Sequence, residues 1–84
     1  MYSVYILLCS DDTLYVGSTK DIEKRLHEHN NLKCGAHYTK IRRPVVLKYK
    51  EDNLTYSEAR TREGELKRLT REKKMALFSH TVFN

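Results

Sequence analysis

Residues 2–17 read YSVYILLCSDDTLYVG, and this stretch decides the fold. The runs 2–9 and 14–17 are rich in β-branched and aromatic residues, which favour strands. Between them, Ser10-Asp11-Asp12-Thr13 has the composition of a turn. Because so short a connection joins antiparallel neighbours, the sequence predicts a β-hairpin.

The register of this hairpin decides which side chains share a face. If Cys9 pairs with Thr13 across a three-residue turn, the period of two places four residues together: Tyr5, Leu7, Tyr15 and Gly17. A slip of one residue would place the two tyrosines on opposite faces. Gly17 indicates that another group approaches the backbone closely at that point.

The rest of the chain alternates between helical and extended patterns. Apolar spacing predicts a helix over 21–30, capped by Thr19 or Asp21, and then a polar, basic loop that ends at Pro44. A third strand follows over 45–49 and ends at residues 51–53. A capping box formed by Thr55 and Glu58 opens a helix that runs to about Thr70, and a last short helix covers 71–79. The order ββαβαα predicts an α+β fold with a three-stranded, mainly antiparallel sheet flanked by helices.

Length and composition limit the classes of protein. A chain of 84 residues suits a single domain over 1–84, and 16 Lys+Arg against 11 Asp+Glu give a net charge of +5. This charge favours an anionic partner such as nucleic acid. The longest apolar run, Val4 to Cys9, is far too short to span a membrane. With no signal-peptide pattern, Cys9 and Cys34 indicate reduced thiols and a cytoplasmic location.

Charged side chains occupy helix positions where a core would expect apolar ones. On a helical wheel, Glu63 falls within about 40° of Ala59, on the apolar stripe of its helix. An inward carboxylate needs a cation or a metal, so an ion pair with an arginine of this chain and a functional role are equally supported. Arg25 and His29, four residues apart, lie in the same way on the apolar side of the first helix.

Five motifs in this order resemble the GIY-YIG nuclease superfamily, specifically its small stand-alone bacterial proteins. The first triplet is similar to Val4-Tyr5-Ile6, with Val in place of Gly, and the second to Tyr15-Val16-Gly17. The family's helix Arg, the His that follows it and the metal-binding Glu match Arg25, His29 and Glu63. Gly35-Ala-His-Tyr-Thr39 and 67–74 match the stand-alone group, and the likeness spans about residues 2–78.

The resemblance implies a metal-dependent endonuclease that hydrolyses phosphodiester bonds in nucleic acid, DNA in preference to RNA, in repair or recombination. Glu63 would hold one divalent ion, Mg²⁺ or Mn²⁺, and Arg25 would contact phosphate. Either Tyr5 or Tyr15 would activate water; we favour Tyr5 as base and Tyr15 as positioner, with His29 accepting or relaying the proton. Residues expected to bind the nucleic acid are Gly17, His37, Lys40, Arg42 and Arg43.

Three alternatives remain. Many catalytic members carry an Asn about a dozen residues after the Glu, and 71–78 contain none, which favours a catalytically silent nucleic-acid-binding domain. The absence of a second DNA-binding domain favours a protein partner for targeting. A zinc site from His27, His29, Cys34 and His37 fits known spacings poorly. A protein–protein adaptor is supported by no exposed apolar stripe.

Overall fold

The computed structural model describes residues 1–31 and 36–79 and contains one three-stranded antiparallel sheet in the order β2-β1-β3. The predicted order ββαβαα is confirmed, with one short added helix, α2, in the segment expected to be a loop. The elements are β1 (Tyr2–Leu8), β2 (Leu14–Thr19), α1 (Ile22–Asn31), α2 (His37–Lys40), β3 (Val46–Leu54), α3 (Tyr56–Arg68) and α4 (Arg71–Ser79).

The hairpin has the expected register. Cys9 N–H donates to the Thr13 carbonyl at 2.9 Å, and Asp12 turns the chain with a φ of 66°. Left-handed backbone at this position is what a three-residue hairpin loop requires, and Asp tolerates it. Tyr5 therefore opposes Gly17 and Leu7 opposes Tyr15. Tyr5 and Tyr15 therefore lie on the same face of the sheet, as this register requires.

The third strand is longer than predicted. It was expected over 45–49 and to end at 51–53, but β3 continues to Leu54. Glu51 and Lys50 pair with Val4 and Tyr5 of the central strand. The ladder shifts register between Tyr2 and Val4, where Asn53 has a φ of 63°, and pairing resumes between Tyr2 and Leu54, so the strand continues past its polar residues.

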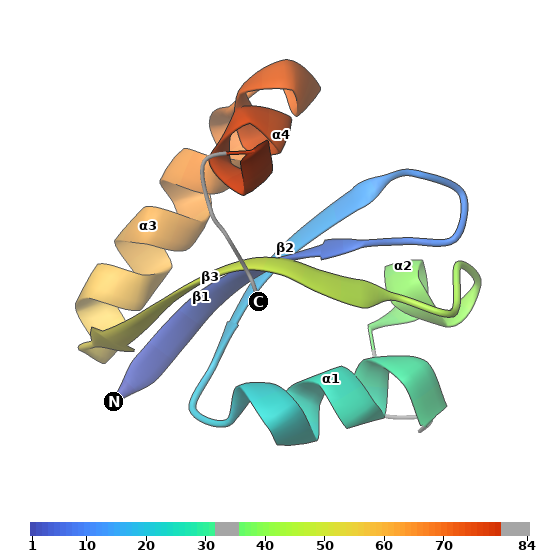
Figure 1. The fold of residues 1–84 in the computed structure, drawn as a ribbon. Helices are drawn as coiled ribbons and strands as arrows, with labels where there is room; N and C mark the ends of the chain where they lie inside the picture. Colours follow the sequence, from blue (N-terminus) through green and yellow to red (C-terminus); the bar gives the residue numbers. More distant parts are fainter. Residues whose placement is uncertain (32–35, 80–84) are drawn as a thin grey trace.

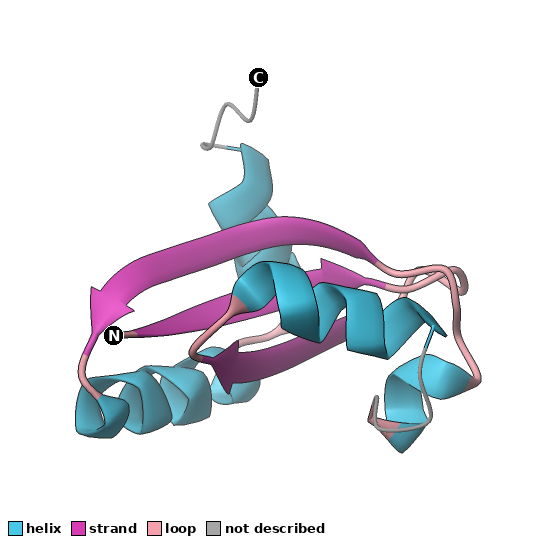
Figure 2. Cartoon of the chain, turned by 90° about the horizontal axis from the view of Figure 1, so that it is seen from below, coloured by secondary structure: helices cyan, strands magenta, loops and turns pink. Residues whose placement is uncertain are grey.

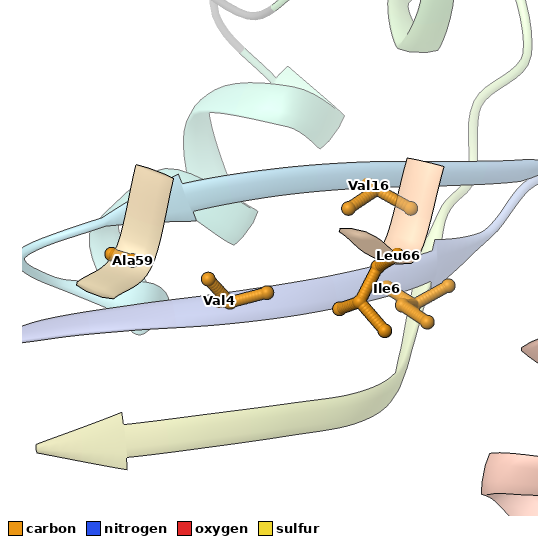
Figure 3. Close-up of a cluster of buried hydrophobic side chains, with 5 residues drawn as sticks. All are labelled: Val4, Ile6, Val16, Ala59 and Leu66. Carbon is orange, nitrogen blue, oxygen red and sulfur yellow. The ribbon is translucent and has the colours of Figure 1, made fainter. Parts of the chain in front are cut away.

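Helices cover both faces of the sheet (Figure 1). On one face α3 and α4 pack against the even-numbered side chains of β1 and β2, in a core built around Val4, Ile6 and Val16 with Ala59 and Leu66 (Figure 3). On the other face α1 lies along the sheet (Figure 2), and odd-numbered residues such as Tyr5 and Leu7 pack with Ile22 and Leu26. The alternation of strand side chains thus produces two thin cores.

The helix starts follow the predicted caps. Asp21, rather than Thr19, caps α1, because its carboxylate accepts the Lys24 N–H at 3.1 Å. The capping box of Thr55 and Glu58 is present at the start of α3, which ends at Arg68, two residues before the predicted end. In the part of the chain that is described, no helix has the length and apolarity to cross a membrane.

Candidate active site

A buried tyrosine and a buried histidine meet on the α1 side of the sheet. Tyr5 comes from the central strand and is 1% exposed, and His29, from the last turn of α1, is fully buried. The Tyr5 Oη and His29 Nε2 atoms lie 2.9 Å apart. Strand alternation aims Tyr5 at α1, and His29 lies on the sheet-facing side of that helix with Ile22 and Leu26. The two residues that the sequence singled out are therefore directly hydrogen-bonded.

The other ring nitrogen of His29 is also occupied. His29 Nδ1 lies 2.7 Å from Thr39 Oγ1, and Thr39 is fully buried in α2. Thr39 is not among the predicted site residues. Its one signal in the sequence is its place at the end of Gly35-Ala-His-Tyr-Thr39. A threonine 10 residues from a histidine has no periodic relation to it, so only folding brings the two together.

Burial keeps both members of the pair neutral near pH 7. Burial and the positive charge of Arg25 lower the pKa of His29 to about 4. Burial and the neighbouring Tyr15 raise the pKa of Tyr5 to about 12, although Arg25 acts in the opposite direction. A neutral phenol beside a neutral imidazole can pass a proton without creating a lasting buried charge.

Arg25 approaches the same phenol. Its guanidinium donates to Glu28 at 2.9 Å and also forms a hydrogen-bonding contact with the oxygen of Tyr5. Burial acts to lower the pKa of Arg25, but the contacts with Glu28 and Tyr5 raise it, so the group stays charged. Because Arg can only donate, its contact with the phenol leaves the phenol hydrogen available for His29 Nε2.

An aromatic cluster continues outward from this pair. The Tyr15 ring packs edge-on against His29, with ring centres 5.1 Å apart, and lies 5.9 Å from Tyr38. Arg42 stacks over Tyr38 at 3.9 Å. Both tyrosine rings lie edge-on to His29, and Tyr5 in addition forms a hydrogen bond with it through its hydroxyl. This difference distinguishes the two candidate bases.

Gly17 is the point where the backbone meets the Tyr5 hydroxyl. A Cβ added at this glycine would lie 2.5 Å from Tyr5 Oη and 2.7 Å from Tyr5 Cζ. No side chain fits in such a gap. The close approach inferred from the sequence is thus an approach of Tyr5 itself, and the role of Gly17 in nucleic-acid binding stays a prediction.

Glu63 reaches the site from the opposite face of the sheet. Its side chain, 12% exposed, accepts from Ser18 Oγ at 2.7 Å and from Lys67 Nζ at 2.8 Å, and Arg60 lies 3.7 Å away. Burial acts to raise the pKa of Glu63, but the hydrogen bonds from Lys67 and Ser18 lower it, and the net shift is downward. The expectation that Glu63 points inward is met. Its principal ionic partner is a lysine rather than an arginine.

The edge strand β2 links the two halves of the site. Ser18, which holds Glu63, directly follows Gly17, which touches Tyr5. The negative charge of Glu63 reaches far enough to contribute to the raised pKa of Tyr5. The described residues enclose no pocket, and the groups of the site gather around the edge strand β2. The charged groups of the site come from both faces of the sheet: Arg25 lies on α1 and Glu63 on α3.

The donor set around Glu63 fits a hard, largely hydrated cation. Two of the roughly four lone-pair positions of its carboxylate are taken by Ser18 and Lys67, which leaves others open. Across residues 1–31 and 36–79, no cluster of three or more His, Cys, Asp or Glu has metal-ligand spacing. Mg²⁺ is commonly held by one or two carboxylates while it keeps several waters.

Some residues predicted to contact nucleic acid lie toward the surface, and others already bind groups of this chain. His37 is exposed and Lys40 is half-buried at the end of α2. Arg42 already binds Asp11 at 2.9 Å, and Arg43 donates to the backbone carbonyls of Glu28 and His29 at 3.2 and 2.6 Å. Arg42 and Arg43 therefore stabilise contacts within the fold. Their contacts with nucleic acid stay a prediction.

The alternative zinc site would need His29 as one of its four ligands. Both ring nitrogens of His29 are engaged, with Tyr5 and Thr39, so neither is open to a metal. His27 is exposed and contacts Asn31. Cys34 lies outside the described residues.

Comparison with known proteins identifies the family of this chain. A sequence model described as the GIY-YIG catalytic domain matches residues 1–76. The UPF0213 protein SSP2268 of Staphylococcus saprophyticus is 55% identical over 76 residues, covering 90% of this chain and 92% of its own. A UPF0213 protein of Staphylococcus aureus strain Mu3 is 53% identical over 74 residues, with coverages of 88% and 89%.

Two solution NMR structures share the fold. The UPF0213 protein BH0048 of Bacillus halodurans superposes with a TM-score of 0.60 at 38% identity, covering 96% of this chain and 86% of the other. The protein EF2693 of E. faecalis gives a TM-score of 0.61 at 39% identity, with coverages of 99% and 91%. From the matched domain and these relatives together, the chain belongs to the GIY-YIG family, among the small stand-alone proteins named UPF0213.

Proposed function

We propose that this protein is a divalent-metal-dependent endonuclease that hydrolyses phosphodiester bonds in DNA, in the cytoplasm. The observation that supports this best is the hydrogen bond of 2.9 Å between Tyr5 Oη and His29 Nε2, with Arg25 at the same phenol. An oxygen acid whose proton points at a neutral imidazole is the arrangement that lets a side chain take a proton from an attacking nucleophile.

In the proposed reaction the proton moves through this pair. As the oxygen of a water molecule bonds to phosphorus, Tyr5 Oη takes the water's proton and passes its own to His29 Nε2. The bond from phosphorus to the leaving deoxyribose oxygen breaks, and that oxygen departs with a proton from solvent. The imidazolium is then neutralised when Nε2 returns its proton to Tyr5, which releases one proton to solvent. The low pKa of His29 favours this return once the phosphate has left.

Arg25 supplies the phosphate contact. Its planar guanidinium suits bidentate binding of a phosphodiester. Because Tyr5 is 1% exposed, water reaches its oxygen when Arg25 turns from the phenol to the phosphate. The half-buried Tyr15, whose ring touches His29, would position the phosphate or the water.

Glu63 would hold the divalent ion, either Mg²⁺ or Mn²⁺. Such an ion, when bound, stabilises negative charge on the oxygens around phosphorus. The ammonium of Lys67 competes with the ion for Glu63, and because its side chain is 56% exposed it can move into solvent when the ion binds.

The test is cleavage of single-stranded and branched DNA, with matched RNA, in Mg²⁺ or Mn²⁺, by the wild type and the Glu63→Ala and Glu65→Ala variants. Glu65 lies two residues away, is 51% exposed and carries the same charge, so it is the matched control. Loss of Glu63 should reduce the rate by about 10²–10³-fold, the usual effect of deleting one preorganised electrostatic group, whereas the control should cleave normally.

The assignment of the base has its own comparison. Tyr5→Phe should reduce cleavage by ~10²-fold or more, and Tyr15→Phe by less, because only Tyr5 bonds the imidazole. The opposite ranking would move the base to Tyr15. If the wild type binds DNA without cutting it, the silent binding domain favoured by the Glu63–Lys67 ion pair replaces the nuclease.

A further inference from the structure

Thr39 closes a buried chain of hydrogen bonds that begins at the proposed base. The chain runs from Tyr5 Oη to His29 Nε2 at 2.9 Å, from His29 Nδ1 to Thr39 Oγ1 at 2.7 Å, and from Thr39 Oγ1 to the Ala36 carbonyl at 2.9 Å. Tyr5, His29 and Thr39 are each at most 1% exposed. Water is therefore excluded from the three side chains, and the direction of each bond follows from the hydrogens that they carry.

The Ala36 carbonyl sets the direction at the Thr39 end. Thr39 Oγ1 donates its single hydroxyl hydrogen to this carbonyl at 2.9 Å, and the same carbonyl also accepts the backbone N–H groups of Thr39 and Lys40 at 3.1 and 3.0 Å. The oxygen of Thr39 then faces His29 with a lone pair. His29 Nδ1 must carry the hydrogen, since two lone pairs at 2.7 Å would repel.

The Tyr5 end fits the same tautomer. The positive charge of Arg25 acts on the phenol and opposes the rise of its pKa, which favours donation of the phenol hydrogen to His29. His29 Nε2 accepts that hydrogen only if it carries none of its own. A neutral imidazole has one N–H, and the Thr39 end assigns it to Nδ1, in agreement with the Tyr5 end.

We propose that Thr39 is a positioning residue: its hydroxyl, anchored on the Ala36 carbonyl, fixes His29 as the Nδ1–H tautomer and turns the bare Nε2 toward Tyr5. The role of this tautomer in proton transfer rests on the proposed function, but the tautomer itself does not. Thr39 touches neither substrate nor metal in this scheme, and it acts only through the ring of His29.

The shape of the site explains why threonine serves here. The side chain is fully enclosed, so its methyl group fills space while its hydroxyl bridges His29 and the backbone. Valine has nearly the same shape without the hydroxyl, and serine has the hydroxyl without the methyl group. Thr39→Val therefore removes the polarity and keeps the packing, and Thr39→Ser does the reverse.

The experiment is NMR of histidine ¹⁵N-labelled protein at pH 7, without nucleic acid or metal, in which two-bond couplings report which ring nitrogen carries hydrogen. Wild-type His29 should show the Nδ1–H form. In Thr39→Val the ratio of Nδ1–H to Nε2–H should fall by about tenfold, the effect of one lost hydrogen bond. Thr39→Ser should restore it, and the exposed control Thr61→Val should leave it unchanged.

Two results would overturn the assignment. One is wild-type His29 in the Nε2–H form, which needs no variant and so does not depend on how Thr39→Val folds. The other is a folded Thr39→Val protein that keeps the Nδ1–H form.

Cleavage assays separate this inference from the proposed function. If DNA is cut, Thr39→Val should lower kcat about tenfold with KM unchanged, and Thr39→Ser should recover it. If DNA is not cut while the tautomer behaves as described, the nuclease proposal fails and the positioning of His29 by Thr39 stands.

Discussion

Gly17→Ala should damage the site without removing any functional group. The new Cβ would lie 2.5 Å from Tyr5 Oη and 2.7 Å from Tyr5 Cζ, well inside contact distance. Tyr5 is 1% exposed and cannot swing into solvent, so the ring must be displaced from the position in which its hydroxyl meets His29. The substitution therefore tests whether the Tyr5–His29 pair depends on a bare backbone at Gly17.

The size of the effect follows from two contributions. Overpacking a buried site costs about 1–3 kcal/mol. Loss of the hydrogen bond to His29 adds about 1 kcal/mol. The sum, about 2–4 kcal/mol, is a large share of the roughly 5–10 kcal/mol expected for a small domain. For a chain of this size, Tm should fall by at least ~10 °C.

Thermal and urea unfolding followed by circular dichroism measure this loss. Gly64→Ala is the matched control, because its Cβ would come no nearer than 3.8 Å to Arg68 and no backbone obstructs it. Alanine in the interior of α3 should stabilise the protein by up to about 1 kcal/mol. Wild-type stability in Gly17→Ala, together with an unchanged His29 NMR spectrum, would refute the close packing described here.

Three further predictions concern charge. The pKa of His29 is about 4 in the folded protein against an ordinary 6.5, so the stability contributed by neutral His29 is full above pH 6.5 and is lost as the pH falls toward 4. At 1.36 kcal/mol per pH unit, this loss is up to about 3 kcal/mol. The variant His29→Gln should therefore show a flatter dependence of stability on pH over this range when it is unfolded in urea. Arg43→Lys should destabilise the protein by ~1–2 kcal/mol in urea, because an ammonium does not reproduce two guanidinium bonds to the carbonyls at the end of α1. Lys67→Met should raise the affinity of Glu63 for Mn²⁺ severalfold in calorimetry by removing a competing cation, and Lys73→Met, on α4, should leave it unchanged.

Most of the fold could be predicted from the sequence because the patterns that specify it are local. Strand runs, a short polar turn and the capping box at Thr55 each act over a few neighbouring residues, so the hairpin and the helix starts were predicted correctly, and the structure has the register that pairs Cys9 with Thr13, one of the two that the sequence left open. The length of β3 was not predicted correctly, because Glu51 and Leu54 pair with β1 on either side of an irregularity in the ladder, where Asn53 has a φ of 63°, and this pairing carries the strand past the predicted end.

The candidate site was only partly readable. Patterning marked Glu63, Arg25 and His29 as polar groups on apolar faces, the hairpin register placed Tyr5 and Tyr15 on one face, and the resemblance supplied their proposed roles. Neither gave Thr39 or the structural use of Arg43, since these depend on contacts between segments with no fixed spacing.

The sequence by itself therefore determined which residues are polar where burial is expected, through periodicities that the backbone imposes on any chain. Only the tertiary structure decided how those residues meet: Tyr5 and His29 beneath one face of the sheet, and Glu63 arriving from the other beside the edge strand. The physical reason is that hydrogen-bond partners and their direction are set when distant segments pack and exclude water, and no local pattern encodes that geometry.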